Sequence, residues 1–343
     1  MKKQFIAGAA LALLSSVATA QTATTVYGVL DIGLTTRNHA PAGTPSTSID
    51  NGGTSPSIWG LRGSEDLGSG LKANFNLEGQ FKVDDGTQIG QLFRRQANVG
   101  ISSADFGTVT LGVQYSPAVL AFGATDPRGI RENYSGLYPW VYGSGANANQ
   151  DVGVFVKNAV SYSNTFDRVN FGAGYSVSEG QGAVVSLGAT YAGPLMVSAA
   201  YESSNKAGTS ERISTKYSVG AGYSVGALTG KLNYLKAVNK DVVTLDETTN
   251  VGMFGLGADW KTAPNNTVMA AVYFAKDKNN GADKTTTFIL SDEYALSRRT
   301  TLYGVLALVN AKAGATVNTS AVAASTLADT KTTFLNAGIK HAF

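Results

Sequence analysis

Hydrophobic and polar residues alternate along much of this chain. In residues 169–177 the odd positions are Val, Phe, Ala, Tyr and Val, the even ones are Asn, Gly, Gly and Ser, and the same period recurs in residues 73–81 and 213–225. A period of two is typical of a β-strand with one apolar and one polar face. The polar face is rich in Gly, Ser and Asn, whereas the buried face of a β-sandwich is apolar. The pattern therefore predicts strands whose apolar face points outward, as in a membrane barrel.

The connections between these strands alternate between short and long. Seven short turns are predicted, at residues 65–70, 104–107, 164–167, 192–194, 225–227, 262–266 and 297–300. Eight longer polar stretches lie near residues 37–56, 82–93, 115–154, 178–183, 203–212, 237–249, 277–284 and 310–331. This alternation implies about 16 strands, an even number with both termini on one side. We therefore predict an all-β fold, an antiparallel transmembrane β-barrel of about 16 strands in which residues 21–343 form a single domain.

The last ten residues carry the alternation to the end of the chain. Ile339 and Phe343 fall on one face, and Lys340 falls on the other. In a closed barrel the last strand pairs with the first. We therefore expect residues 334–343 to pair with residues 24–36, with Phe343 facing lipid at the rim and Lys340 facing the lumen.

The connection at residues 115–154 is much longer than ordinary loops, most of which have fewer than about 15 residues. A barrel of about 16 strands encloses an aqueous channel, so such a loop has room to fold into the lumen and set the width of the pore. The loop carries both charge signs, in Asp126, Arg128, Arg131 and Glu132. The alternative is that these charges are solvated on the outer surface.

Residues 1–20 have the pattern of a secretory signal peptide. Lys2 and Lys3 precede an apolar run, and Ala18-Thr19-Ala20 is a small-x-small cleavage site. The alternative is a retained membrane anchor. Beyond this segment no apolar run approaches the roughly 18 residues that a spanning helix needs.

Composition argues against several classes of function. The chain has 27 Lys+Arg and 24 Asp+Glu, a near balance that is atypical of nucleic-acid-binding proteins. It has no Cys, and nothing places its two histidines, His39 and His341, beside a nucleophile. Asp84-Asp85-Gly86 resembles half of a calcium loop, but the remaining ligand spacing is absent. We therefore predict no enzyme activity, no metal site, no cofactor and no nucleic-acid partner.

Four segments together resemble the general-diffusion porins of β-proteobacteria. They are Val-Tyr-Gly-Val-Leu-Asp at 26–31, Trp-Gly-Leu-Arg-Gly-Ser-Glu-Asp-Leu-Gly at 59–68, Arg-Gln-Ala-Asn-Val-Gly at 95–100 and Gly-Ile-Lys-His-Ala-Phe at 338–343. The resemblance runs from the signal peptide to the last residue, and the combination is more specific than any single segment.

The resemblance implies a homotrimer in the cell outer membrane. Each subunit would be a 16-stranded barrel whose third extracellular loop folds into the pore, so that ions and small hydrophilic solutes diffuse passively. The implied partners are outer-membrane lipid, lipopolysaccharide and the barrel-insertion machinery, for which Phe343 would be the assembly signal.

In that family, basic residues of the wall face acidic residues of the third loop. The matching wall positions are Arg62, Arg95 and Lys157. Alternation places Arg62 on the lumen side, whereas an inward Arg95 would turn Gln96 and Asn98 outward. The alternative for each base is a side chain that snorkels at the membrane rim.

One position departs from the family pattern. Family members often have Gly-Arg-Gln before the third loop, and this chain has Gly-Val-Gln at 112–114. A cation is therefore missing there, and the candidates to replace it are Arg37, Arg94, Arg128 and Arg131. With Asp126 and Glu132 on the loop, we expect a weak anion preference that arises from rings of charge. The alternatives are a substrate-specific channel for a sugar or an organic anion, and a barrel whose loops serve adhesion.

Overall fold

The structure is a computed structural model that describes residues 23–142, 147–151, 153–322 and 327–343. The predicted signal peptide, residues 1–20, lies outside the described residues. No helix in the described ranges is long and apolar enough to cross a membrane.

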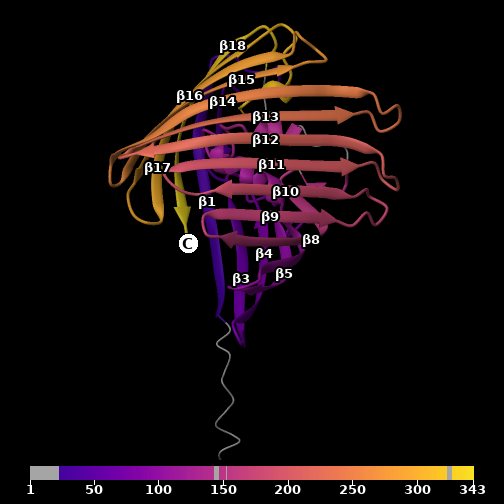
Figure 1. The fold of residues 1–343 in the computed structure, drawn as a ribbon. Coiled ribbons are helices and arrows are strands. Elements are labelled where there is room, and N and C mark those ends of the chain that lie inside the picture. Colours follow the sequence, from indigo (N-terminus) through magenta and orange to yellow (C-terminus); the bar gives the residue numbers. More distant parts are fainter. Residues whose placement is uncertain (1–22, 143–146, 152, 323–326) are drawn as a thin grey trace, which may run out of the picture.

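Antiparallel strands close into a single barrel (Figure 1). One sheet of 18 strands closes on itself because β18 pairs with β1. The strands are β1 (Ala23–Arg37), β2 (Thr47–Asn51), β3 (Ile58–Gly68), β4 (Leu71–Gln80), β5 (Gln96–Ser103), β6 (Gly107–Tyr115), β7 (Gln150–Asp151), β8 (Phe155–Phe166), β9 (Val169–Ser176), β10 (Val184–Tyr191), β11 (Leu195–Asn205), β12 (Arg212–Val225), β13 (Leu228–Lys240), β14 (Glu247–Ala263), β15 (Asn266–Asp277), β16 (Lys284–Ala295), β17 (Thr300–Ala311) and β18 (Lys331–Ala342). The helical elements are α2 (Pro117–Thr125), α3 (Leu137–Tyr142) and the short 3₁₀ helix η1 (Val317–Thr319).

Sixteen strand positions surround the lumen, because β2 and β7 are short additions to the 18-stranded sheet. β2 and β3 pair with successive parts of β1 and so share one position. β7 has two residues and pairs with β8. The predicted 16-stranded antiparallel barrel is confirmed, and each predicted turn and loop lies between the expected strands to within a few residues.

The predicted faces of the strands are also confirmed. On β9 the odd residues Val169, Phe171 and Tyr175 are exposed, and the even side of the same strand carries glycines. We call the face with exposed apolar side chains outward and the opposite face inward. In a membrane the outward side chains contact lipid and the inward polar face lines the lumen, which is the arrangement of an outer-membrane barrel.

The last strand closes the barrel. β18 pairs with β1 from Val29 opposite Ala342 to Arg37 opposite Phe334, which confirms the predicted closure and extends it one residue past the predicted range of 24–36. At the rim Gly28 and Phe343 exchange two backbone hydrogen bonds of 3.3 and 3.1 Å. The ring of Phe343 occupies the space that a Cβ on residue 28 would fill, so only glycine fits this contact.

Candidate functional site

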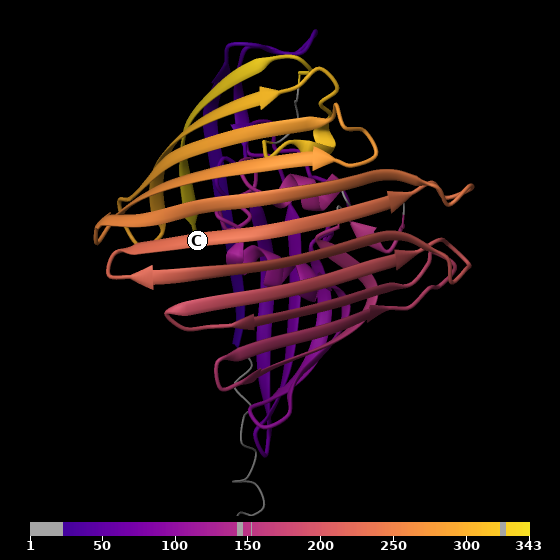
Figure 2. The same ribbon diagram turned by 45° about the horizontal axis from the view of Figure 1, so that its top comes forward.

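The segment between β6 and β8 packs against the inward face of the wall. α2 contacts β9, β10, β11 and β12, and both views show it between the wall of β9–β15 and the wall of β3–β6 (Figure 2). Pro117 lies against Gly172 and Gly188, and Thr125 lies against Gly220, where a Cβ would collide with the loop. The inward glycines of the wall therefore let the helix backbone approach directly.

This segment has an apolar core of its own. Phe122 of α2 and Trp140 of α3 stack with their ring centroids 4.9 Å apart, and both are fully buried. Leu235 and Met253 extend the cluster to the inward face of β13 and β14. The apolar residues of the loop are thus folded onto the wall, and Val113, at the position where the family resemblance led us to expect a cation, packs against the same cluster.

A buried ion pair on the wall lies beside the loop. Glu202 of β11 and Lys216 of β12 are directly opposite in register, and the Lys216 Nζ lies 2.6 Å from a Glu202 carboxylate oxygen. Lys216 also lies over the ring of Trp140, 4.7 Å from its centroid, and donates to the Gly153 carbonyl.

The same pair holds both ends of the loop. Glu202 accepts hydrogen bonds from the Ser116 hydroxyl, just before α2, and from the Gln150 amide at 2.7 Å. Sequence reasoning missed this anchor. The sequence gives only a weak indication of the pair: Glu202 and Lys216 are single charged residues at inward positions of strands whose central residues are otherwise uncharged.

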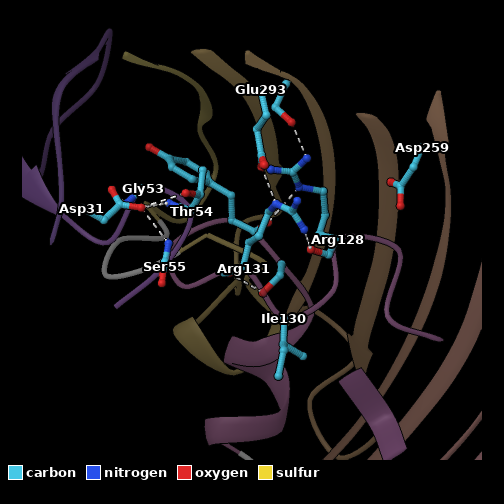
Figure 3. A network of polar contacts seen from close by, with 12 residues as sticks. Asp31, Gly53, Thr54, Ser55, Arg128, Ile130, Arg131, Asp259 and Glu293 are labelled. Carbon is cyan, nitrogen blue, oxygen red and sulfur yellow. Dashed lines mark hydrogen bonds and ion pairs between the residues drawn. The ribbon is translucent and has the colours of Figure 1, made fainter. Parts of the chain in front are cut away.

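Asp126 and Arg128 are fully buried inside the loop, and Figure 3 shows Arg128 next to Arg131. Asp126 accepts hydrogen bonds from the backbone N–H groups of Arg128 and Ile130 and from the Tyr273 hydroxyl. The Arg128 guanidinium donates to the Tyr134 carbonyl and to the Ser291 hydroxyl. Both charges therefore hold the loop in shape and fasten it to β15 and β16, away from water.

Four cations surround a cavity of about 640 Å³ between the loop and the wall. They are Arg94, Arg95, Arg131 and Lys340. Glu132 also lines the cavity and accepts a hydrogen bond from the Gln80 amide at 3.2 Å. Of the sequence-predicted site residues, the fold thus brings Arg95, Arg131 and Glu132 together.

The three arginines of this cavity are paired with carboxylates that lie outside its lining. Arg95 is 2.7 Å from Glu78, and Arg94 is 2.6 Å from Asp151. Arg131 extends from the loop to Glu293 of β16 at 2.6 Å (Figure 3). Lys340 has no ion pair within the part of the chain that the structure describes.

The sequence inference that an inward Arg95 would turn Gln96 and Asn98 outward is wrong. β5 begins at Gln96, and Arg95 lies just before it. In the pairing of β4 with β5, Gln96 is the residue opposite Glu78. The backbone N–H of Arg95, one residue earlier, also donates to the Glu78 carbonyl. Two residues therefore face one, and the alternation of inward and outward side chains is broken between Arg95 and Gln96. Arg95 and Gln96 both contact Glu78, and Asn98 lies opposite the inward Asn76.

Two predicted wall cations lie apart from this cavity. Arg62 is opposite Thr25 on the inward face, as alternation predicted, and its guanidinium lies 4.9 Å from the centroid of the Tyr27 ring. Lys157 lies near the start of β8 and does not line the cavity. Of the remaining candidate substitutes for the missing cation, Arg37 lies 3.7 Å from Asp50 at the loop end of the barrel.

A second buried carboxylate that sequence reasoning missed organises the first loop. Asp31 of β1 is fully buried and accepts hydrogen bonds from the backbone of Gly53, Thr54 and Ser55 (Figure 3). It also accepts a hydrogen bond from the Tyr303 hydroxyl. These bonds hold residues 52–57 against the inward face of β17. An acidic residue in the centre of an apolar strand was the available sequence signal.

Comparison with known proteins identifies the architecture. Residues 7–314 match the Gram-negative porin family. The chain belongs to that family. It is 34% identical to outer membrane porin protein 32 of Delftia acidovorans and 29% identical to an outer membrane porin of Bordetella pertussis, with full coverage of both chains in each case.

Solved structures agree with this assignment. The porin is similar to an anion-selective porin from Comamonas acidovorans, with a TM-score of 0.81 and 28% identity over 94% of this chain and 100% of that one. The trimer form of OmpT from Vibrio cholerae shares the fold, with a TM-score of 0.69 and 17% identity over 94% and 99% of the two chains. The protein is therefore a pore-forming protein of the outer membrane and not an enzyme.

Removing one charge of the buried pair should release the loop. In Lys216→Met, Glu202 is left buried without a counter-charge, and we expect the free energy of unfolding to fall by about 3 kcal/mol. Denaturant unfolding of the detergent-solubilised porin measures this, and single-channel recordings should show a noisier current. The double variant Glu202→Gln/Lys216→Met removes both charges and should recover most of the stability. Equal stability of Lys216→Met and the wild type would contradict the anchor.

Proposed function

We propose that this porin is a general-diffusion channel for ions and small hydrophilic solutes with a weak preference for anions. Its narrowest part would lie between the loop of residues 116–154 and the wall strands β3, β4, β5 and β18. The packing of α2 on inward glycines and the buried Glu202–Lys216 pair support a loop that stays in the lumen.

The lining of the charged cavity carries the anion preference. Four cations face it, and Glu132 is the carboxylate among its described lining residues. The carboxylate partners of the three arginines, Glu78, Asp151 and Glu293, are not among the lining residues of the cavity. Because these partners still neutralise much of the charge, the expected preference is weak, and Arg62 and Lys340 carry its unpaired part.

A substrate-specific channel is the second candidate. Tyr115 and Phe155 flank the Arg95 guanidinium, whose carbon lies 5.7 and 4.8 Å from their ring centroids. Such a combination of cation and aromatic rings suits a small organic anion better than a sugar, because most other tyrosines of the strands point outward. Block of the single-channel current by a small carboxylate, but not by chloride at equal ionic strength, would favour this candidate.

We also propose that three subunits associate, through the outward faces of β1 and β3. On these faces the rings of Phe343 and Phe75 lie over Gly28 and Gly63, beside the exposed Val26, so the surface is apolar. The remaining outward band would contact lipid and lipopolysaccharide, and Phe343 would be read by the barrel-insertion machinery.

Removing unpaired cations should reduce the anion preference. For Arg62→Gln/Lys340→Gln, the reversal potential in a KCl gradient should move toward zero, with the chloride-to-potassium permeability ratio lowered by about twofold or more. Lys284→Gln, which removes an outward-facing cation, should leave the ratio unchanged. A cation preference in the wild type would overturn the assignment.

The selectivity should depend on pH through Glu132. Burial raises the pKa of the Glu132 carboxyl, against the opposing effects of Arg95 and Gln80. Its negative charge is therefore lost at a higher pH than for an ordinary glutamate, whose pKa is about 4.3. As pH falls, the anion preference should rise with a midpoint above that value. Reversal potentials in a KCl gradient, measured as a function of pH, test this. Glu132→Gln should show the higher anion preference already at neutral pH, and its selectivity should no longer change through this midpoint. If the selectivity of Glu132→Gln changes with pH as in the wild type, Glu132 is not the titrating group.

Phe343 should be needed for assembly more than for conduction. We expect Phe343→Ala to give several-fold less heat-modifiable barrel in membranes, because the ring that covers Gly28 is lost while the backbone bonds remain available. Channels that do assemble should conduct normally. Leu335→Ala, which truncates another exposed outward side chain of β18, is the matched control. Normal yield of Phe343→Ala would contradict the role.

A further inference from the structure

A second cavity in the lumen, of about 800 Å³, lies between α2 and the strands β5, β6, β8, β9 and β10. It extends toward the turn end of the barrel, since Gly107 at the turn between β5 and β6 and Asn164 near the turn between β8 and β9 both line it. It adjoins the charged cavity at Tyr115, which lines both. Its volume is in the range of small-molecule sites, about 300–1,000 Å³.

This cavity differs from the first one in charge, because none of its described lining residues is charged. β5, β6, β9 and β10 contain no Asp, Glu, Lys or Arg, and the one such residue of β8, Lys157, does not line the cavity. Elsewhere the inward face is charged near the turns, as where the Lys231 Nζ lies 3.0 Å from the Asp259 carboxylate. The lack of charge is therefore specific to these five strands, and an ion finds no counter-charge on them.

The wall of the cavity is a regular array of hydroxyl groups. Thr108 of β6 lies opposite Ser163 of β8, and Thr110 lies opposite Ser161. Thr190 of β10 lines the same cavity. Neighbouring strands are about 5 Å apart, and successive residues on one face of a strand are about 7 Å apart. The wall thus offers hydroxyls at several points within the reach of one small molecule.

Most of these hydroxyls are free to bind a solute. Four of them make no side-chain hydrogen bond within the ranges that the structure describes, namely those of Thr108, Thr110, Ser163 and Thr190. Ser161 differs, because its hydroxyl donates to the side chain of Gln114. The three threonines are half-buried, and Ser163 is exposed. Each free hydroxyl can both donate and accept a hydrogen bond.

α2 adds an apolar flank to the cavity. Leu120 is 55% exposed although α2 lies inside the barrel (Figure 2), and it lines this cavity together with Pro117. Its neighbours Val119 and Phe122 are fully buried, so Leu120 is not part of the face by which the helix packs on the wall. An apolar side chain that is exposed in a polar lumen is a surface that a ligand can cover.

We propose that this cavity binds a neutral sugar or polyol. Such a solute has hydroxyls for the array on β6, β8 and β10, a C–H face for Leu120, and no charge that would need a counter-ion. Anions and neutral solutes would then bind at different places along one channel. The inference rests on the diffusion channel proposed above, through which a solute reaches the cavity, but it does not depend on the anion preference.

Block of the ion current by glucose tests the proposal. Glucose should reduce the single-channel current of the wild type in a saturable way, beyond the linear effect of viscosity. Thr108→Val/Thr110→Val removes two free hydroxyls at constant side-chain shape and should raise the half-blocking concentration about 25-fold, from about fivefold for each neutral hydrogen bond. Leu120→Ala should raise it about fivefold, because it removes the apolar flank.

A matched control is Thr267→Val. Thr267 lies opposite the inward Glu293 but does not line the cavity, so this variant should be blocked within about twofold of the wild type. Because the solute is neutral, the half-blocking concentration should also be the same at low and high KCl. Heat modifiability on gels checks that each variant has assembled.

Three outcomes would overturn the proposal. They are a purely linear effect of glucose on the wild type, an unchanged half-blocking concentration in both the threonine double variant and Leu120→Ala, and an equal loss of block in Thr267→Val. The reversal potential in a KCl gradient, recorded on the same channels, should be unchanged in all three variants because no charge is altered. A cation preference there would refute the proposed anion preference and leave the result for glucose standing.

Discussion

Barrel closure is the constraint on which the rest of the structure depends. In lipid every backbone polar group must be paired within the protein, and a closed ring of strands satisfies this without an edge. Closure by β18 on β1 assigns each residue to lipid or to lumen, and it makes the terminal contact between Gly28 and Phe343 part of the ring. Glycines of the inward face follow from the same geometry, since α2 and the residue before it pack directly on them.

Charge inside the barrel is used in two distinct ways. The buried groups Asp31, Asp126, Arg128 and the Glu202–Lys216 pair connect loops to the wall, and their burial is acceptable because each accepts or donates several hydrogen bonds. The arginines around the cavity are each paired with one carboxylate, Arg94 with Asp151, Arg95 with Glu78 and Arg131 with Glu293. In the proposed channel these fixed charges would act by electrostatic filtering.

The sequence by itself determined the features that follow from local periodicity. The period of two assigned the faces of β9 and β18, the spacing of turns predicted the number of strand positions, and the parity of Arg62 and Lys340 placed both on the inward face. Only the tertiary structure decided which charges meet. Glu202 and Lys216 pair across two strands, and Arg131 reaches Glu293 over 162 residues. The inward turn of Arg95 depends on one irregularity before β5. These contacts depend on strand register and on how the segment between β6 and β8 packs on the inward face of the wall, and both are set by long-range packing that local patterns do not encode.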